Sequence, residues 1–284
     1  AVVRGDDDDP VIDRDLLERL PAAFERLRHD GVKRDPQCRG KVAIAKALRR
    51  VDASAEEVFL VGVRTVQQEP VWGGRVDTAA ELRGVCAMAL MEARHPRAPV
   101  EVAHLLADPE IAARSAAARA LGASGWADVA EPLLRLRLEA GEPEPAVVGE
   151  CLGALLQVAP GESLPYVAGY LRSSDHAVAE AAALSLGESR LDGALEPLCA
   201  EAGRLVSSDG RHAVVMLAIA MLRSDAAWGW LLERVEQGGR GQALAALRAL
   251  ATFRHDPRLL ARVSEAVARR TEEPIETTFE ELFG

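Results

Sequence analysis

The chain has 284 residues, of which 49% are hydrophobic and only 4% aromatic. Its formal net charge of −10 falls on residues 101–284, because residues 1–100 hold 17 basic and 17 acidic side chains of the totals of 34 and 44. An acidic body argues against a general binder of nucleic acids or anionic membranes, and no run of about 18 apolar residues could span a membrane.

The N-terminal segment is acidic and then turns helical. Four consecutive aspartates at 6–9 repel one another and bury no apolar surface, so we expect residues 1–12 to be disordered. Residues 13–29 place Leu17, Leu20, Phe24 and Leu27 at helical spacing, which predicts the first helix.

The next stretch, residues 33–50, holds seven basic side chains and one acid. Arg39, Lys46 and Arg50 share one face of a predicted helix, and we call these three residues the basic stripe. One interpretation is a site for an anionic partner, such as a nucleic acid or a phosphate-bearing protein. The other is a solvated face, since no aromatic side chain is interleaved to stack bases.

A period of about 32 residues then runs through the chain. Predicted helices end in comparable leucines at Leu48, Leu90, Leu121, Leu155, Leu186, Leu222 and Leu250. A fixed period of this length, built from helix pairs with few aromatics, predicts an all-α fold and an α-solenoid. An aspartate lies thirteen residues before the leucine in the first three copies, followed six residues later by a base: Asp35 and Lys41, Asp77 and Arg83, Asp108 and Arg114. We expect the aspartate to cap a helix and the base to pair with the aspartate of a neighbouring copy.

These residues resemble HEAT repeats, in particular the short HEAT-like repeats of many bacterial proteins and of phycobilin lyases. The resemblance rests on Pro132 in the first helix of a pair, Asp108 in the turn and Arg114 in the second helix. It implies a right-handed superhelix of about seven helix pairs over residues 13–270, with residues 271–284 as a C-terminal cap or tail. Later copies lack the base, so we expect the acid–base ladder only in the N-terminal half.

The repeat is broken at residues 67–77. This longer stretch contains Pro70, Trp72, Gly73-Gly74 and Arg75, and we expect it to be a loop between helices over 55–68 and 78–93. Trp72 and Arg75 are candidate contacts for a protein partner, because a tryptophan offers a large area and one polar N–H. The alternative is that Trp72 folds back and fills a gap between unequal repeats.

A second irregularity is the uncharged helix predicted over residues 213–222, preceded by His212. One interpretation is that its apolar surface forms a groove for a partner helix or an apolar ligand, with Met216 and Met221 as adaptable contacts. The other is that this surface is buried, by tighter curvature of the solenoid or by homo-oligomerisation.

Chemical motifs are missing from the sequence. The histidines have no Cys, Asp or His partner at ligand spacing, and the glycine clusters do not form a dinucleotide fingerprint, so we expect no metal, cofactor or catalytic residue. Cys86 and Cys151 occupy positions held by alanine in other copies, which indicates small core residues. Four widely spaced cysteines fit a reduced, cytoplasmic protein.

The function favoured by the sequence is therefore a non-catalytic scaffold or regulatory adaptor, which binds another protein on the concave face of a solenoid. The alternatives are binding of a nucleic acid or phosphate-bearing partner through residues 33–50, and an enzyme like the HEAT-like lyases or DNA glycosylases. We expect the protein not to be an enzyme, and the predicted partner surface comprises Trp72, Arg75, Arg39, Lys46, Arg50, His212, Met216 and Met221.

Overall fold

The computed structural model describes residues 3–4, 10–11, 14–51, 55–270 and 272–284. It divides into two compact units, Ala1–Ala140 and Gly141–Gly284. The disorder expected for residues 1–12 falls mostly on positions outside the described residues. Of these twelve, the described ones form a short antiparallel pair, β1 (Val3–Arg4) with β2 (Pro10–Val11).

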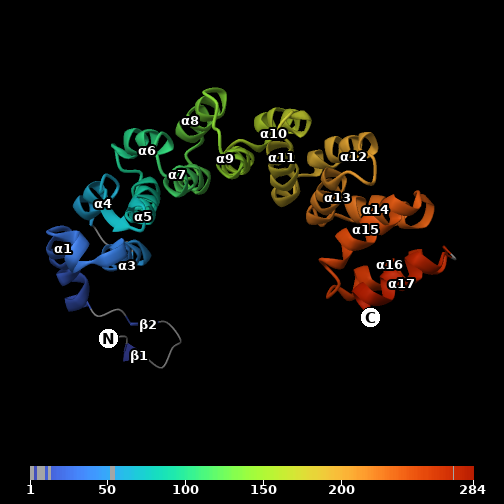
Figure 1. Cartoon of the computed structure of the whole chain (residues 1–284), viewed down its shortest axis with the longest axis horizontal. Helices are drawn as coiled ribbons and strands as arrows, with labels where there is room; N and C mark the ends of the chain where they lie inside the picture. The colour runs from blue at the N-terminus through green and yellow to red at the C-terminus, as the bar shows by residue number, and fades with distance from the viewer. Residues whose placement is uncertain (1–2, 5–9, 12–13, 52–54, 271) are drawn as a thin grey trace. The chain divides into compact units, whose positions relative to one another are not determined.

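Unit 1 is built from short helices that pack in succession (Figure 1). Its elements after the first pair are α1 (Arg14–Arg28), α2 (Gly31–Arg34), the 3-10 helix η1 (Pro36–Cys38), α3 (Arg39–Arg50), α4 (Glu56–Gly62), β3 (Gln68–Val71), β4 (Gly74–Asp77), α5 (Ala80–Glu92), α6 (Ala98–Leu106), α7 (Ile111–Ala123) and α8 (Ala127–Glu139).

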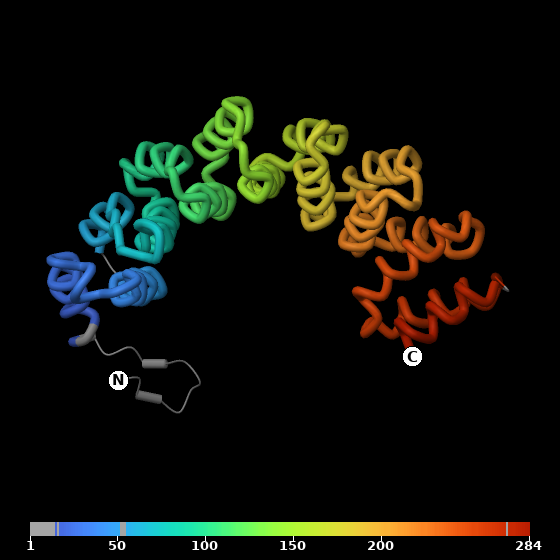
Figure 2. The backbone as a smooth tube through the Cα atoms, viewed as in Figure 1, coloured from blue at the N-terminus to red at the C-terminus, as the bar shows by residue number. Residues whose placement is uncertain are grey.

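Unit 2 continues the same alternation of helices, which Figure 2 traces along the backbone. Its elements are α9 (Pro145–Val158), α10 (Pro160–Gly169), the 3-10 helix η2 (Tyr170–Arg172), α11 (His176–Ser189), the 3-10 helix η3 (Asp192–Ala194), α12 (Leu195–Arg204), α13 (Gly210–Met221), α14 (Asp225–Gln237), α15 (Arg240–Ala251), α16 (Pro257–Ala268) and α17 (Glu273–Phe283).

Each unit has two layers. In unit 1, α3, α5 and α7 stack on one another, and α4 and α6 pack outside them; in unit 2, α9, α11, α13 and α15 stack, with α10, α12 and α14 outside (Figure 1). The stacked helices are those that carry the periodic leucines, of which Leu48, Leu90 and Leu121 are 1% exposed or less. The predicted fold is confirmed: the chain is an all-α solenoid of HEAT-like repeats.

Small side chains set the distance between stacked helices. A Cβ added to Gly187 on α11 would lie 2.5 Å from the backbone oxygen of Ala218 on α13. Cys86 and Cys151 each lie four residues before the leucine of their repeat, and both are fully buried, as expected for small core residues. The glycines, alanines and cysteines of the period therefore allow the backbones to approach closely.

The predicted acid–base ladder is present in part in unit 1: Arg83 makes the expected contact with a neighbouring repeat, and Lys41 does not. Arg83 is 2% exposed and donates to Asp77 of its own repeat at 2.6 Å and to Asp108 of the next repeat at 2.8 Å. Lys41 pairs with Asp35 at 2.9 Å, but its contact in the next repeat is Gln67 Oε1, at 2.7 Å. The rungs of the ladder are therefore chemically different from one another.

The expected loop at 67–77 is a β-hairpin, and the helix expected over 55–68 ends at Gly62. β3 pairs with β4 antiparallel, with Val71 opposite Gly74 and Gln68 opposite Asp77. The turn is possible because Gly73 adopts a φ of 87°, which a side chain would disfavour. The strands escape a pattern search because most of their residues are exposed and none alternates cleanly.

The C-terminal segment forms α17, which packs on α15 and α16. Ile275 is fully buried there, and the rings of Phe279 and Phe283 stack with their centroids 5.2 Å apart. Residues 272–284 are thus a packed helix of unit 2.

Candidate functional site

A candidate site lies within unit 1, and we call it the basic pocket. It is an open cavity of about 900 Å³. Five of its thirteen lining residues are basic and none is acidic; the thirteen are Arg28, Gly31, Val32, Lys41, Leu60, Val61, Arg64, Thr65, Val66, Gln67, Gln68, Arg75 and Arg97.

The pocket wall is assembled from segments that are far apart in the sequence. Arg28 ends α1, Lys41 lies in the first turn of α3, and Arg97 directly precedes α6. The hairpin contributes Gln68 and Arg75, one from each strand. Periodicity in one repeat therefore could not reveal the pocket, because each repeat supplies only one or two of its cations.

Gln67 holds the floor of the pocket together and was missed by the sequence analysis. Its Oε1 accepts from Lys41 Nζ at 2.7 Å, its Nε2 donates to the Asp35 backbone oxygen at 2.8 Å, and its backbone N–H donates to Asp77 at 2.9 Å. Gly31 allows this approach, since a Cβ there would lie 2.4 Å from Gln67 Oε1. One side chain thus joins the base of the hairpin to α2 and α3.

Burial and charge oppose each other at Asp35. Desolvation raises its pKa, but hydrogen bonds from the Lys41 ammonium and from the backbone N–H groups of Gly40 and Lys41 outweigh it, so the pKa lies below the ordinary value. The ion pair is 1% and 5% exposed. The floor of the pocket therefore contains a buried lysine, Lys41, that Asp35 and Gln67 hold in place.

Glu101 holds two of the lining arginines. Its side chain is 1% exposed and accepts from Arg64 Nε at 2.6 Å and from Arg97 Nη2 at 3.1 Å. Desolvation raises the pKa of Glu101, but the hydrogen bonds from the two arginines lower it by more, so the pKa lies below its ordinary value. Two arginines share one carboxylate, which leaves one positive charge.

The pocket keeps a positive balance. Its five cations contact three carboxylates, Glu25 at Arg28, Asp35 at Lys41 and Glu101 at Arg64 and Arg97, which leaves two positive charges (5 − 3). Within the described residues Arg75 contacts no carboxylate; its Nη2 donates to the Gln68 backbone oxygen at 3.1 Å. Glu69 lies behind the lining and is held by Gln67, Thr78 and the Gln37 backbone.

The hairpin projects exposed apolar side chains next to this pocket. Trp72 at the turn is 104% exposed, and Val71 and Val76 are about half exposed. Trp72 does not fold back, so the alternative in which it fills a gap between repeats is wrong. Arg75 lines the pocket and Trp72 does not; the two predicted residues share the hairpin, where Arg75 lies on β4 and Trp72 in the turn.

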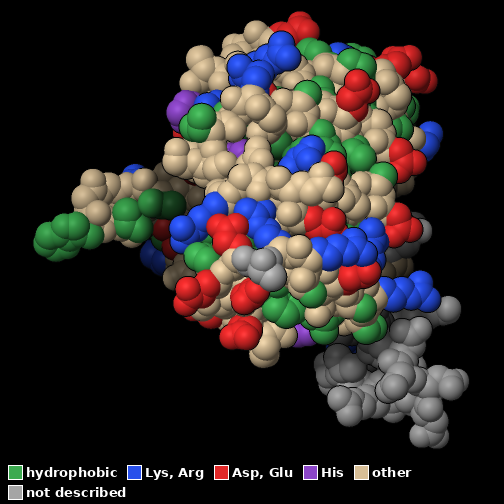
Figure 3. All heavy atoms as spheres, turned by 90° about the vertical axis from the view of Figure 1, so that its right-hand side faces the viewer, with side chains coloured by type: hydrophobic (Ala, Val, Ile, Leu, Met, Phe, Trp, Pro, Cys, Tyr) green, Lys and Arg blue, Asp and Glu red, His purple; other side chains and the backbone are tan. Residues whose placement is uncertain are grey.

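The basic stripe is a different surface. None of Arg39, Lys46 and Arg50 lines the basic pocket. Lys46 pairs with Glu81 of α5 at 2.6 Å, and Arg39 donates to Gln37 Oε1 at 2.6 Å. Figure 3 shows another face, the right-hand side of Figure 1 with the C-terminal helices, where acidic and basic side chains are interspersed. Partner binding by this stripe stays a prediction, and its charge is partly neutralised by the next repeat.

The apolar helix α13 is covered within unit 2. It packs between α11 and α15, so His212 and Met216 are 1% and 0% exposed, while Met221 is half-buried. The groove interpretation requires an exposed apolar face, and the structure instead favours the alternative of a buried one. His212 and Met216 line a smaller cavity of unit 2.

Metal binding and thiol catalysis have little support in the described part of the chain. There, no group of three His, Cys, Asp or Glu side chains could hold a metal ion. Cys38, Cys86 and Cys151 are buried, and burial raises the pKa of the Cys38 thiol to about 11. Among the helices of the described residues, none is long and apolar enough to cross a membrane.

Comparisons with known proteins identify no family. No family model matches the sequence, and no curated protein matches it. Among solved structures, the complex of CpcE and CpcF of phycocyanin lyase from Nostoc sp. PCC7120 is 17% identical with a TM-score of 0.45, and the match covers 99% of both chains. A crystal structure of an engineered protein is 14% identical with a TM-score of 0.37, over 94% of this chain and 74% of that one.

The first of these structures corrects two expectations. The sequence favoured a non-catalytic scaffold, with a lyase or DNA glycosylase only as an alternative, because quasi-linear arrays rarely supply a closed pocket. The first of these solved structures is that of a lyase complex. It contradicts the expectation that the protein is a non-catalytic scaffold and not an enzyme, and we do not retain that expectation.

Proposed function

We propose that the chain is a lyase-type protein that holds an anionic, largely apolar organic ligand in the basic pocket, with an open-chain tetrapyrrole as the best-fitting class. The observation that carries the proposal is a large cavity lined by five cations and no acid. Its volume lies within the range of small-molecule sites, roughly 300–1,000 Å³.

The two walls of the pocket suit the two parts of such a ligand. Val32, Leu60, Val61 and Val66 supply an apolar side for a conjugated ring system. Arg28, Arg75 and the arginine pair on Glu101 line the same pocket, and a guanidinium can bind a carboxylate through two N–H groups. Two surplus positive charges match the two propionates of an open-chain tetrapyrrole.

The hairpin gives the pocket a protein-facing edge. Trp72 and the half-exposed valines beside it offer an apolar surface, and aromatic anchors of this kind dominate protein interfaces. For the transfer step we propose that the S–H of a carrier-protein cysteine adds across a ligand double bond, so that the S–C bond forms and the proton goes to the neighbouring carbon. Our proposal is that the pocket orients the ligand while Trp72 contacts the carrier.

Biliverdin and its dimethyl ester test the binding step. Biliverdin should bind with a change in its visible absorbance, and the ester, which lacks the carboxylates, should bind at least about tenfold more weakly. Arg75→Glu should weaken biliverdin binding by a similar factor, because it reverses a charge in the lining. Arg50→Glu is the matched control, an exposed arginine of the same unit outside the pocket.

The catalytic step needs a separate readout. Incubation of the loaded protein with phycocyanin apoprotein, followed by mass spectrometry, should show addition of the whole ligand mass to a cysteine. Trp72→Ala should slow this transfer without changing biliverdin affinity. Equal binding of biliverdin and its ester, together with no effect of Arg75→Glu, would show that the pocket does not hold such an anion.

A further inference from the structure

A second cavity lies inside unit 2 and is independent of the basic pocket. It has a volume of about 410 Å³ and is enclosed by α12, α13, α14 and the start of α15. The lining residues with chemical character are Cys199, His212, Met216, Trp230, Arg234 and Gln242.

His212 is the first sign that the cavity is built for a ligand. The residue is 1% exposed, and within the described part of the chain its Nδ1 is buried without a hydrogen-bond partner. Burial lowers its pKa, against a weaker opposite effect of Asp209, so the imidazole is neutral at neutral pH. An unpaired buried ring nitrogen is costly, and in the tautomer that carries the proton on Nδ1 a bound acceptor would satisfy it.

Arg234 supplies the positive charge of the cavity. Its guanidinium carbon lies 4.4 Å from the centroid of the Trp230 ring. Nη1 contacts Glu233 at 3.3 Å, and among the described residues no other acceptor contacts the guanidinium. No acidic side chain lines the cavity. Arg234 therefore keeps N–H donors for an anion, and the packing on Trp230 holds the guanidinium plane in place.

Apolar side chains form one part of the remaining lining, and Gln237 and Gln242 form a polar part. Met216 is fully buried, and the Trp230 ring forms a flat surface beside it. Burial raises the pKa of the Cys199 thiol to about 11, although Arg234 opposes the shift. The thiol therefore stays protonated, adds no negative charge and is not a nucleophile at neutral pH. Binding rather than covalent chemistry is what this arrangement can do.

We propose that this cavity binds a small aromatic carboxylate, with the carboxylate on Arg234, the ring against Trp230 and Met216, and a hydrogen bond from His212 Nδ1. One guanidinium beside a neutral imidazole matches a single negative charge, whereas a phosphate dianion needs more positive charge. The proposal does not depend on the function assigned to unit 1.

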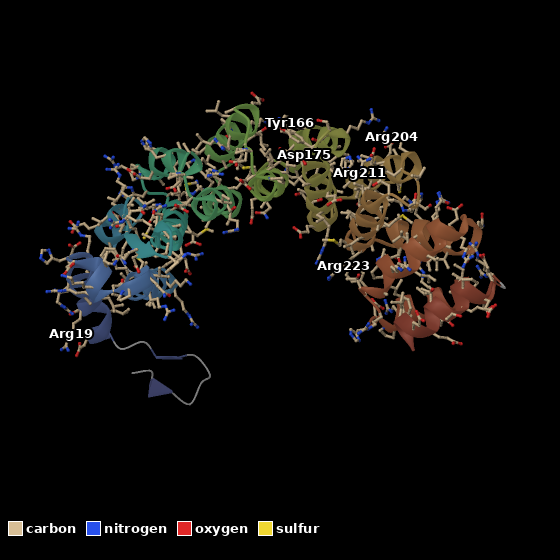
Figure 4. The ribbon with its side chains drawn as sticks, viewed as in Figure 1. Arg19, Tyr166, Asp175, Arg204, Arg211 and Arg223 are labelled. Atoms are coloured by element: carbon tan, nitrogen blue, oxygen red, sulfur yellow. The ribbon has the colours of Figure 1, made fainter. Side chains whose placement is uncertain are left out.

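Calorimetric titration of the full chain with 2-naphthoate tests the site, with 2-naphthamide and inorganic phosphate as parallel probes. We expect naphthoate to bind at concentrations below about 10 mM, and the amide and phosphate to bind at least about tenfold more weakly. Arg234→Gln should weaken naphthoate binding by about tenfold to a hundredfold. Arg223→Gln is the matched control: Arg223, labelled in Figure 4, lies over the Phe253 ring at 4.7 Å but does not line the cavity.

An imidazole resonance in the NMR spectrum locates the binding. The chain has six histidines, and naphthoate should shift the resonance that disappears in His212→Asn. Should Arg234→Gln fail to fold, the comparison of naphthoate with the amide and the His212 shift still decide the matter. Absence of binding, tighter binding of phosphate or of the amide, equal effects of Arg234→Gln and Arg223→Gln, or a binding event that leaves His212 unshifted would each overturn the proposal.

Discussion

Replacement of Arg83 by methionine removes the central rung of the buried ladder while keeping most of the side-chain volume. Arg83 donates to the Thr65 backbone oxygen, to Asp77 and to Asp108, at 2.9 Å, 2.6 Å and 2.8 Å. Asp77 is 3% exposed and keeps two backbone donors, from Gln67 and Ala79. Asp108 is 12% exposed and keeps one, from Glu110.

The expected loss of stability follows from the two carboxylates that remain without Arg83. Breaking a buried ion pair from one side typically costs about 3–5 kcal/mol, because the other charge stays buried without its partner. Here the retained backbone donors reduce the penalty, so we expect Arg83→Met to lower the free energy of unfolding by about 3 kcal/mol at pH 7. Urea denaturation followed by far-UV circular dichroism measures the change.

The sign of the pH dependence gives a second check. Burial raises the pKa of Asp77, but its hydrogen bonds, including that from Arg83, outweigh this and lower it below the ordinary value of 3.8. A depressed pKa contributes stability above the ordinary pKa that is lost as pH falls through the folded value. Arg83→Met forfeits this contribution, so its deficit should shrink as the pH falls below 3.8.

Arg49→Met is the control in the same unit. Arg49 pairs with Glu92 at 2.6 Å, but the two side chains are 37% and 42% exposed. Exposed pairs contribute at most about 1 kcal/mol. If Arg83→Met costs no more than Arg49→Met, or if its deficit does not depend on pH, the buried ladder is not what stabilises the stacking.

Three further variants test other features. Gly187→Ala should destabilise unit 2 by about 1–3 kcal/mol in urea denaturation, because its Cβ would meet the Ala218 backbone at 2.5 Å. The wild-type protein should lose stability as pH falls below the ordinary His212 pKa of 6.5, since the unfolded imidazole takes up a proton that the buried one resists, and His212→Asn should flatten that slope. Trp72→Ala should leave the melting temperature within about 1 °C of wild type, because the ring is fully exposed; a larger fall would place Trp72 in a packed contact.

The repeats were predictable because their physics is local. The leucine period and the Asp–Arg spacing within a repeat define the stacked helices and even the contact between Arg83 and Asp108. The hairpin was not predictable, since its strands are short and exposed and its conformation depends on a positive φ at Gly73. Gln67 could not be singled out either, because a single glutamine forms no sequence motif. Its role depends on three partners that only the folded structure brings to it.

The candidate sites depended still more on tertiary structure. The basic pocket combines cations from residue 28 to residue 97, and each of them looks like an ordinary surface charge in its own helix. Lys41 belongs to residues 33–50, which the sequence singled out, but it is buried against Asp35 and does not lie on the exposed surface of that segment. Lys46 of the same segment is neutralised by Glu81. His212 was noticed, but for the apolar helix after it and not for the cavity that it lines.

The unequal rungs of the ladder bear on how the chain avoids misfolding. Repeats of similar sequence can exchange places during folding, because a helix docked one repeat out of position still buries its leucines and alanines. Such a mistake would leave Lys41 facing an aspartate where it needs Gln67, or Arg83 without the second carboxylate that it requires. A misplaced repeat would then bury an unpaired charge, which is far more costly than a poor apolar contact. The different polar contacts of the ladder thus favour the correct pairing of neighbouring repeats over a shifted one.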